Sequence, residues 1–164
     1  MKLREFISSD RHAPGFTLVE LMIALAIIAV LAAIAVPMYT KQVQKSRRVD
    51  ARTAVLDLAG REERFLSTSG SYATTWAQLG FATAGNTSTP TPVGSGYYQL
   101  SAVSVAGVAA TNTPPSYTVS ATVIAGSSQV KDLACQYFSV DNTGKQFSSA
   151  TNAGGTDTST TCWN

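Results

Sequence analysis

The fold of this chain is decided by the stretch GFTLVELM at residues 15–22, which opens a long apolar segment. Residues 16–38 contain only two polar side chains, Thr17 and Glu20. A helix needs about 20 apolar residues to cross a bilayer, so this segment is long enough to span a membrane. An ionised side chain at the centre of a membrane helix costs about 2.5–3.5 kcal/mol, so a carboxylate in this segment predicts a functional partner.

The residues before this segment form a short polar leader. Residues 1–15 carry three basic side chains, two acidic ones and His12. Under the positive-inside tendency this leader should stay cytoplasmic. In a secretory signal the apolar stretch precedes the cleavage site, whereas here the polar leader and Gly15 come first. Cleavage after Gly15 would leave the apolar segment at the start of the mature protein and would create an α-amino group at Phe16, about one helical turn from Glu20.

These residues resemble the prepilin processing motif of type IV pilins and pseudopilins. The resemblance implies cleavage between Gly15 and Phe16 by a prepilin peptidase on the cytoplasmic side, followed by N-methylation of the Phe16 amine. Glu20 matches the family's assembly glutamate, which is thought to meet the N-terminus of a neighbouring subunit. Pro37 lies where such pilins often have a proline that kinks or loosens the helix.

The role of Glu20 also has a physical basis. In an apolar filament core the carboxylate would lose its hydration, and a positive amine from an adjacent chain would offset that cost and fix the axial register of the subunits. The alternative is a residue near a helix end that reaches interfacial water, where its position in the first turn also favours the helix dipole.

The apolar helix is expected to continue past Pro37 into a soluble amphipathic half. Apolar positions recur there at roughly helical spacing. They are Ala51, Val55, Leu58, Ala59, Phe65 and Leu66, with Glu62 on the same face. Residues 68–71 are an expected stop, because Gly70 tolerates the left-handed conformation. The predicted division is a leader at 1–15, a membrane and assembly half at 16–38, a soluble half at 39–70 and a remaining region at 71–164.

The C-terminal region is expected to form an antiparallel sheet. Residues 71–96 are predicted to be a loop, because residues 86–94 are rich in helix and strand breakers. Residues 97–105, 117–124, 135–140 and 145–148 form β-prone runs, with a turn at residues 141–144 between the last two. We therefore predict an α+β chain of the type IV pilin fold, in which a sheet of three or four strands packs on the soluble half of the helix.

Catalytic and ligand-binding signals are weak. The single histidine, His12, lies in the leader, and no metal cluster or cofactor motif is found, so we expect neither an enzyme nor a cofactor. The turn at residues 141–144 lacks the full ligand spacing of a calcium loop. Only Lys131 and Lys145 are basic after Arg64, so nucleic acid is not expected as a partner. Tyr97, Tyr98 and Tyr117 suggest either an adhesive surface or packing of the sheet.

Cys135 and Cys162 are the only cysteines in the chain. In an exported protein they are expected to form a disulfide, which would contribute about 3–4 kcal/mol on the chain-entropy estimate. The alternative is two unpaired thiols. A C-terminal disulfide-bounded region also resembles type IV pilins. Together with the segment RRVDAR at residues 47–52 and the final cysteine and tryptophan, it resembles the PilE-type minor pilins in particular.

The resemblance implies a structural subunit of a type IV pilus, with a minor pilin as the first choice and twitching motility and adhesion as the associated processes. Its partners would be other pilin subunits, in a homo- or hetero-polymer, the prepilin peptidase and the inner-membrane assembly machinery. The subunit would first cross the bacterial inner membrane once, with a cytoplasmic N-terminus and a periplasmic domain, and would end in an extracellular pilus. The alternatives are a major pilin, a type II secretion pseudopilin, or a membrane-tethered periplasmic binding or enzymatic domain.

Overall fold

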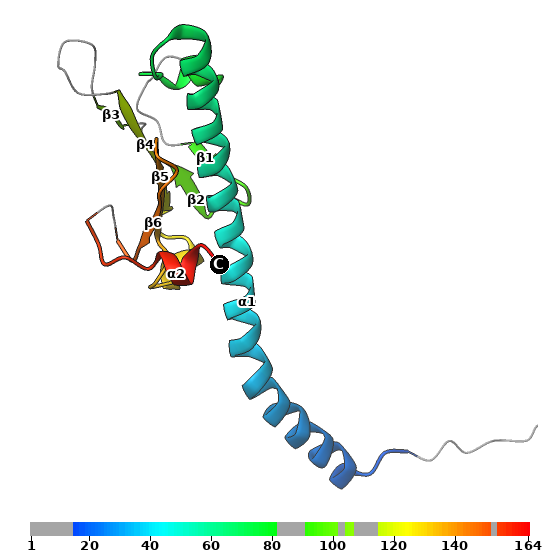
Figure 1. The fold of residues 1–164 in the computed structure, drawn as a ribbon. Coiled ribbons are helices and arrows are strands. Elements are labelled where there is room, and N and C mark those ends of the chain that lie inside the picture. Colours follow the sequence, from blue (N-terminus) through cyan, green and yellow to red (C-terminus); the bar gives the residue numbers. More distant parts are fainter. Residues whose placement is uncertain (1–14, 82–90, 102–103, 107–114, 152–153) are drawn as a thin grey trace, which may run out of the picture. The chain divides into compact units, whose positions relative to one another are not determined.

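The computed structural model describes residues 15–81, 91–101, 104–106, 115–151 and 154–164. The chain divides into two compact units, Met1–Thr40 and Lys41–Asn164. Helix α1 (Leu18–Ser69) begins in the first unit and ends in the second, which also contains the sheet (Figure 1). Apart from Gly15, the predicted leader lies outside the described residues, as does His12.

α1 begins at Leu18, two residues later than predicted, because Thr17 caps its N-terminus. The Oγ1 atom of Thr17 accepts a hydrogen bond from the backbone N–H of Glu20 at 3.2 Å. The Thr17 carbonyl accepts another from the backbone N–H of Leu21 at 3.2 Å. A threonine oxygen here satisfies one of the backbone donors that the first turn leaves free.

α1 ends at Ser69, where the sequence predicts a stop. Gly70 has a φ of 74°, in the left-handed region, and its N–H donates to the Leu66 carbonyl at 2.8 Å. This backbone conformation closes many helices and favours glycine. The predicted apolar face of the soluble half is also confirmed. The buried residues of α1 are Ala51, Val55, Leu58, Ala59 and Glu62.

The sheet is antiparallel, and its described strands are β1 (Thr91–Val93), β2 (Tyr98–Leu100), β3 (Ser104–Ala106), β4 (Ser116–Val123), β5 (Tyr137–Asp141) and β6 (Gln146–Ser149). Their order is β1-β2-β4-β5-β6, and β3 also pairs with β4. Three of the predicted runs correspond to β4, β5 and β6, while the run at residues 97–105 is divided between β2 and β3. The α+β fold is therefore confirmed, with short extra strands beyond the predicted three or four.

The region predicted to be a loop, residues 71–96, contains two short elements. The 3₁₀-helix η1 (Trp76–Leu79) is closed by Gly80, which has a φ of 80°. Strand β1 contains Pro92, which cannot donate a ladder hydrogen bond, and β1 accordingly lies at an edge of the sheet. Residues 82–90, which include most of the predicted breaker segment, lie outside the described residues.

The core of the second unit lies between the soluble half of α1 and the sheet. Tyr98 and Tyr117 are 1% and 4% exposed, and they contribute rings to this core. Tyr117 packs edge-on against Tyr72 with ring centroids 4.8 Å apart, and Tyr98 against Phe138 at 5.7 Å. Such pairs stabilise a core beyond the area that they bury. Packing of the sheet is therefore the role of these two tyrosines.

Candidate functional site

The residues of the processing motif lie at the exposed start of the first unit. Phe16 is 83% exposed, and Gly15 and Glu20 are exposed as well. Glu20 lies in the first turn of α1 with its backbone N–H bound to Thr17. No cation among the described residues pairs with the Glu20 carboxylate. The side chain is thus free to meet a group from outside the chain.

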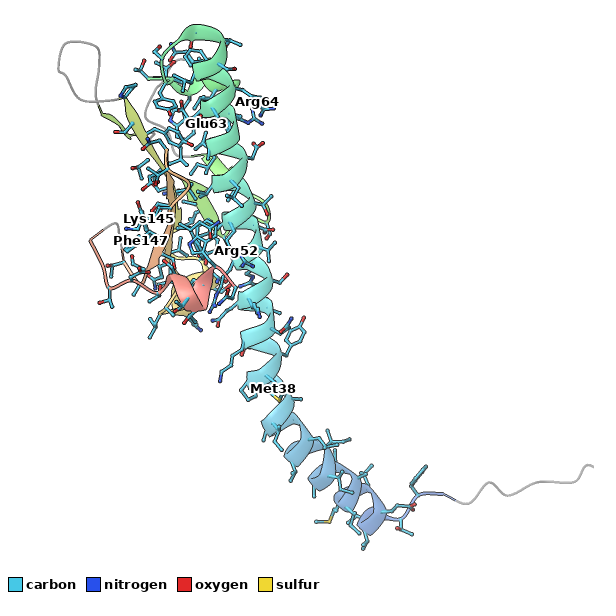
Figure 2. The ribbon with its side chains drawn as sticks, in the orientation of Figure 1. Met38, Arg52, Glu63, Arg64, Lys145 and Phe147 are labelled. Atoms are coloured by element: carbon cyan, nitrogen blue, oxygen red, sulfur yellow. A yellow bond between two sulfur atoms is a disulfide. The ribbon has the colours of Figure 1, made fainter. Side chains whose placement is uncertain are left out.

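The first half of α1 presents apolar side chains on all sides (Figure 2). Every residue from 18 to 40 is exposed in the single chain. By length and composition, α1 is the one helix among the described residues that could cross a membrane. The helix continues through Pro37, whose carbonyl accepts a hydrogen bond from the Thr40 hydroxyl at 2.9 Å. An apolar helix without an inward-facing side requires lipid or other helices around it.

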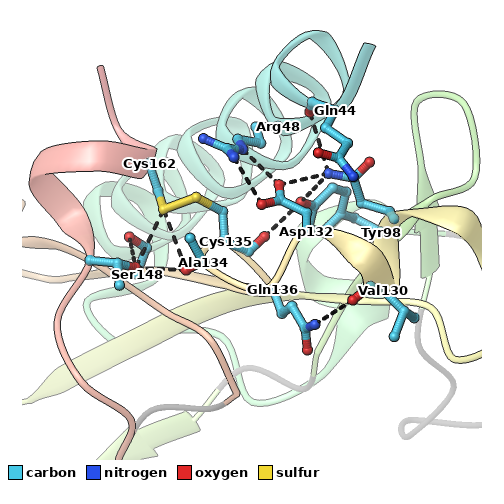
Figure 3. Close-up of polar contacts among 12 residues, drawn as sticks. Gln44, Arg48, Tyr98, Val130, Asp132, Ala134, Cys135, Gln136, Ser148 and Cys162 are labelled. Carbon is cyan, nitrogen blue, oxygen red and sulfur yellow. Dashed lines mark hydrogen bonds and ion pairs between the residues drawn. A yellow bond between two sulfur atoms is a disulfide. The ribbon is translucent and has the colours of Figure 1, made fainter. Parts of the chain in front are cut away.

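In the second unit, Cys135 and Cys162 form a disulfide with their Cα atoms 5.7 Å apart. Both cysteines are buried, and Cys162 ends the short helix α2 (Ser159–Cys162). The hydroxyl of Thr158 donates to the Ala134 carbonyl at 2.9 Å, beside the disulfide (Figure 3). The disulfide therefore fixes the C-terminal turn to the strand that begins at Tyr137.

A buried polar network lies next to the disulfide and connects it to α1 (Figure 3). Arg48 binds Asp132 through two hydrogen bonds, Nε to Oδ2 at 2.7 Å and Nη2 to Oδ1 at 2.8 Å. Gln129 donates to the same Oδ2 atom at 2.9 Å and to the Tyr98 hydroxyl at 3.2 Å. The Tyr98 hydroxyl donates to the Cys135 carbonyl at 2.7 Å. The network joins α1, strand β2 and the segment that contains η2 (Ser128–Lys131).

Two further arginines on α1 bind the same region. The Arg47 guanidinium lies 3.6 Å from the ring centroid of Tyr97 and donates to the Ser128 hydroxyl at 2.8 Å. Arg52 donates to the Trp163 carbonyl at 2.7 Å. For these charges the sequence favoured a solvated helix face or subunit contacts over a site for lipid headgroups, and it predicted none of these contacts within the subunit. The sequence held one indication of the pair between Arg48 and Asp132. Few charged residues follow Arg64, and an aspartate that is buried in such a region needs a cation.

Glu62 is a buried carboxylate near the end of α1. Its Oε2 atom accepts a hydrogen bond from the backbone N–H of Ala73 at 2.9 Å, and its Oε1 atom is buried with no partner among the described residues. Burial raises the pKa of Glu62, the Ala73 hydrogen bond lowers it, and the negative charge of Glu63 raises it further; the net shift is upward. Glu62 therefore holds the chain after α1 against the helix.

Residues 37–139, more than half of the chain, match a family model described as "Type IV minor pilin ComP, DNA uptake sequence receptor". The chain belongs to this family of type IV minor pilins. Residues 10–36 match the prokaryotic N-terminal methylation motif, which covers the processing site. The pilin is also 41% identical over 82 residues to the type IV major pilin protein PilA of Myxococcus xanthus (strain DK1622). The match covers 50% of this chain and 36% of PilA, so it spans about a third of the relative.

These matches confirm the resemblance to type IV pilins and, among them, to minor pilins; the matching family model is that of ComP. Membership of a structural family suggests a structural role for this pilin. Among the residues that the structure describes, no group of three or more His, Cys, Asp or Glu side chains could hold a metal ion. The aspartate of the predicted turn, Asp141, instead accepts hydrogen bonds from Thr143 and Lys145.

Proposed function

We propose that this pilin is a structural subunit of a type IV pilus, incorporated as a minor component or as a primer of the filament. The observation that carries the proposal is the fully exposed apolar half of α1 joined directly to the processing motif. Burial of these helices against one another would supply most of the free energy of assembly. The pilus functions to which the subunit contributes would be twitching motility and adhesion.

The proposed route to the filament begins with processing. A prepilin peptidase cleaves between Gly15 and Phe16, and the Phe16 amine is then methylated. Residues 16–38 hold the subunit in the bacterial inner membrane, with the N-terminus cytoplasmic and the sheet periplasmic. The inner-membrane assembly machinery then transfers the subunit into a polymer with other pilin subunits, which extends outside the cell.

Within the filament, Glu20 would pair with the N-terminal amine of a neighbouring subunit. The free carboxylate in the first turn of α1 supports this assignment. An unpaired charge in an apolar core is strongly destabilising, so only one axial register satisfies it. Pro37 removes one backbone donor from α1 and would let the helix loosen or kink as the filament forms.

The test of this function is the variant Glu20→Ala, expressed in a pilus-forming host. Processing at Gly15 and membrane insertion should remain normal, because the substitution leaves Gly15, Phe16 and the apolar segment unchanged. Incorporation into sheared filaments should fall at least about tenfold, since removing one partner of a buried pair leaves the other charge unpaired at a cost of about 3–5 kcal/mol. Glu20→Gln should behave like Glu20→Ala, because the amide keeps the shape but loses the charge.

The control is Glu63→Gln, which removes an exposed carboxylate on the soluble half of the same helix. It should leave filament content unchanged. Normal filament content in both Glu20 variants would contradict the assembly role of Glu20. Absence of the unmodified pilin from the filaments would instead favour a tethered periplasmic domain. A major pilin or a type II secretion pseudopilin would instead be recognised from its abundance in filaments or from loss of enzyme secretion on deletion.

The matching family is described as a DNA uptake sequence receptor. For this chain we propose that the sheet region does not bind duplex DNA through a basic stripe. Residues 65–164 contain two lysines and three aspartates, and Arg47, Arg48 and Arg52 are engaged within the subunit. Nonspecific DNA affinity depends on free cations that neutralise phosphates. Binding of duplex DNA by the full chain at low salt, lost on raising the salt, would overturn this proposal.

A further inference from the structure

We propose that a basal patch of this pilin rests on anionic lipid headgroups while the subunit is held in the membrane. The basal patch consists of Val130, Lys131 and Leu133 in and after η2, together with Lys41 and Lys45 at the start of the soluble half of α1. The inference rests on the proposed membrane storage and adds a second contact with the bilayer, made by the periplasmic unit.

The outward side chains of the η2 segment are unusually exposed for their type. Leu133 is 75% exposed, whereas the next most exposed large apolar side chain described in the second unit, Leu56, is 47% exposed. Its neighbours alternate in direction. Asp132 and Gln129 are buried, while Lys131 and Val130 face solvent. An exposed leucine two positions after an exposed lysine has the mixed apolar and basic character of an interfacial lipid contact.

The segment is held rigidly in this orientation. Asp132 is fixed by Arg48 and by Gln129, so the residues on either side of it cannot turn inward. The Val130 carbonyl accepts a hydrogen bond from Gln136 at 2.7 Å (Figure 3). The disulfide at Cys135 closes the segment two residues after Leu133. The apolar tip is therefore exposed by a stable scaffold.

The charge of the basal patch suits an anionic surface. Lys41, Lys45 and Lys131 are exposed, and none of them forms an ion pair with another of the described residues. Lys41 and Lys45 are four residues apart and so lie on one helix face, which they share with Arg48. The acidic side chain within the segment, Asp132, is neutralised by Arg48.

The contacts of η2 with α1 join the two parts of the basal patch within the second unit. Gln129 donates to the Gln44 carbonyl at 3.3 Å, which joins η2 to the helix. Gln44 follows Met38, the last residue of the apolar run, by six positions, so along the chain the basal patch begins within two helical turns of the predicted membrane segment.

The experiment uses the full chain inserted in nanodiscs that carry gadolinium-chelating lipids, with NMR line broadening read at each backbone amide. One preparation contains phosphatidylcholine alone and the other an equal mixture with phosphatidylglycerol. Amides of residues 130–133 should broaden much more strongly in the mixture. Each lysine at an anionic surface should favour the docked form about fivefold. The exposed turn at residues 143–144 should remain equally sharp in both preparations.

Lys131→Glu and Leu133→Gln should each abolish the lipid dependence, because one reverses a charge and the other removes the apolar tip. Lys145→Glu, at the β5–β6 turn (Figure 2), is the matched control and should leave it unchanged. Equal broadening of residues 130–133 in both lipids would overturn the proposal. If Leu133→Gln then also lowered the filament content, the basal patch would be assigned to a contact between subunits. Absence of broadening in residues 20–36 would contradict membrane storage itself and so overturn both inferences.

Discussion

The backbone of Gly94 lies directly against the carboxylate of Asp50. A Cβ atom at Gly94 would come within 2.5 Å of the Asp50 Cγ and Oδ2 atoms, and Gly94 has a φ of +53°. The same Oδ2 atom accepts hydrogen bonds from the Ser95 hydroxyl at 2.6 Å and from the Ser95 backbone N–H at 3.2 Å. The turn between β1 and β2 is therefore tied to α1 at a place where only glycine fits.

Gly94→Ala should destabilise the pilin by about 1–3 kcal/mol, from the strained φ and from displacement of Asp50. Thermal unfolding of the full chain in detergent micelles measures this change. Gly96→Ala is the matched control, because Gly96 has a φ of +77° but no atom within 4 Å of the added Cβ. Equal losses in the two variants would show that the approach to Asp50 has no cost of its own.

Arg48→Met should cost about 3–5 kcal/mol, because it leaves the buried Asp132 carboxylate unpaired. The Arg48 and Asp132 side chains are 17% and 3% exposed, so solvent screens this pair little. Adding Asp132→Leu to Arg48→Met should restore much of the loss, since the uncompensated charge is then removed. Chemical unfolding of the single and double variants gives the coupling free energy.

Arg64→Met serves as the control for this cycle, because Arg64 is exposed and binds no acidic side chain in the part of the chain that the structure describes. Its effect should stay within about 0.5 kcal/mol. A double variant as unstable as the sum of the two single losses would contradict the assigned pairing.

Glu62 should make the free energy of unfolding fall as the pH rises, whereas a salt-bridged carboxylate makes it rise. Its pKa is raised in the folded protein by burial, so ionisation above that pKa destabilises the fold. This cost is relieved as the pH falls from above the folded pKa towards the unfolded value of about 4.3. Glu62→Gln removes the ionisation, so its stability relative to the wild type should be greatest near neutral pH and should shrink on acidification.

Unfolding curves of wild type and Glu62→Gln, recorded across this pH range, test the prediction. The glutamine can still accept the Ala73 hydrogen bond through its amide oxygen, which isolates the effect of charge. A difference between the two proteins that does not change with pH would disprove the assigned ionisation cost.

Replacing both cysteines, Cys135→Ser with Cys162→Ser, should lower stability by about 3–4 kcal/mol, because the two sites are 27 residues apart in sequence and the unfolded chain regains that freedom. Hydrogen exchange should rise first in α2 and at the start of β5, because the disulfide joins Cys162 of α2 to Cys135 just before β5. The matched measurement is the wild type with and without a reductant. Unchanged exchange in α2 after reduction would contradict this account.

Much of the fold could be predicted from local patterns. The apolar run, the buried face from Ala51 to Glu62 and the strand β4 follow directly from period and composition. Strand β1 could not be predicted, because Pro92 in a turn-rich segment indicates a loop. Only the neighbouring strand shows that Pro92 occupies an edge, where its missing donor is harmless.

The candidate site also has a part that the sequence predicts and a part that it does not. The processing motif and Glu20 are contiguous in sequence, so the sequence alone was enough to propose them. The partners of Arg47, Arg48 and Arg52 lie 81 to 111 residues further along the chain, and no local spacing predicts such pairs. The same network buries Asp132 and leaves the neighbouring Leu133 exposed. The exposure of Leu133 therefore could not be predicted from local sequence.

The most direct test of the account is mass spectrometry of the pilin in sheared surface filaments, quantified against the other pilin subunits. We expect a trace species that begins at Phe16 with a methylated amine, as a processed minor pilin requires. A dominant Phe16-methylated species would contradict the minor role and identify the major subunit. Absence of the pilin from the filaments would contradict the proposed function altogether.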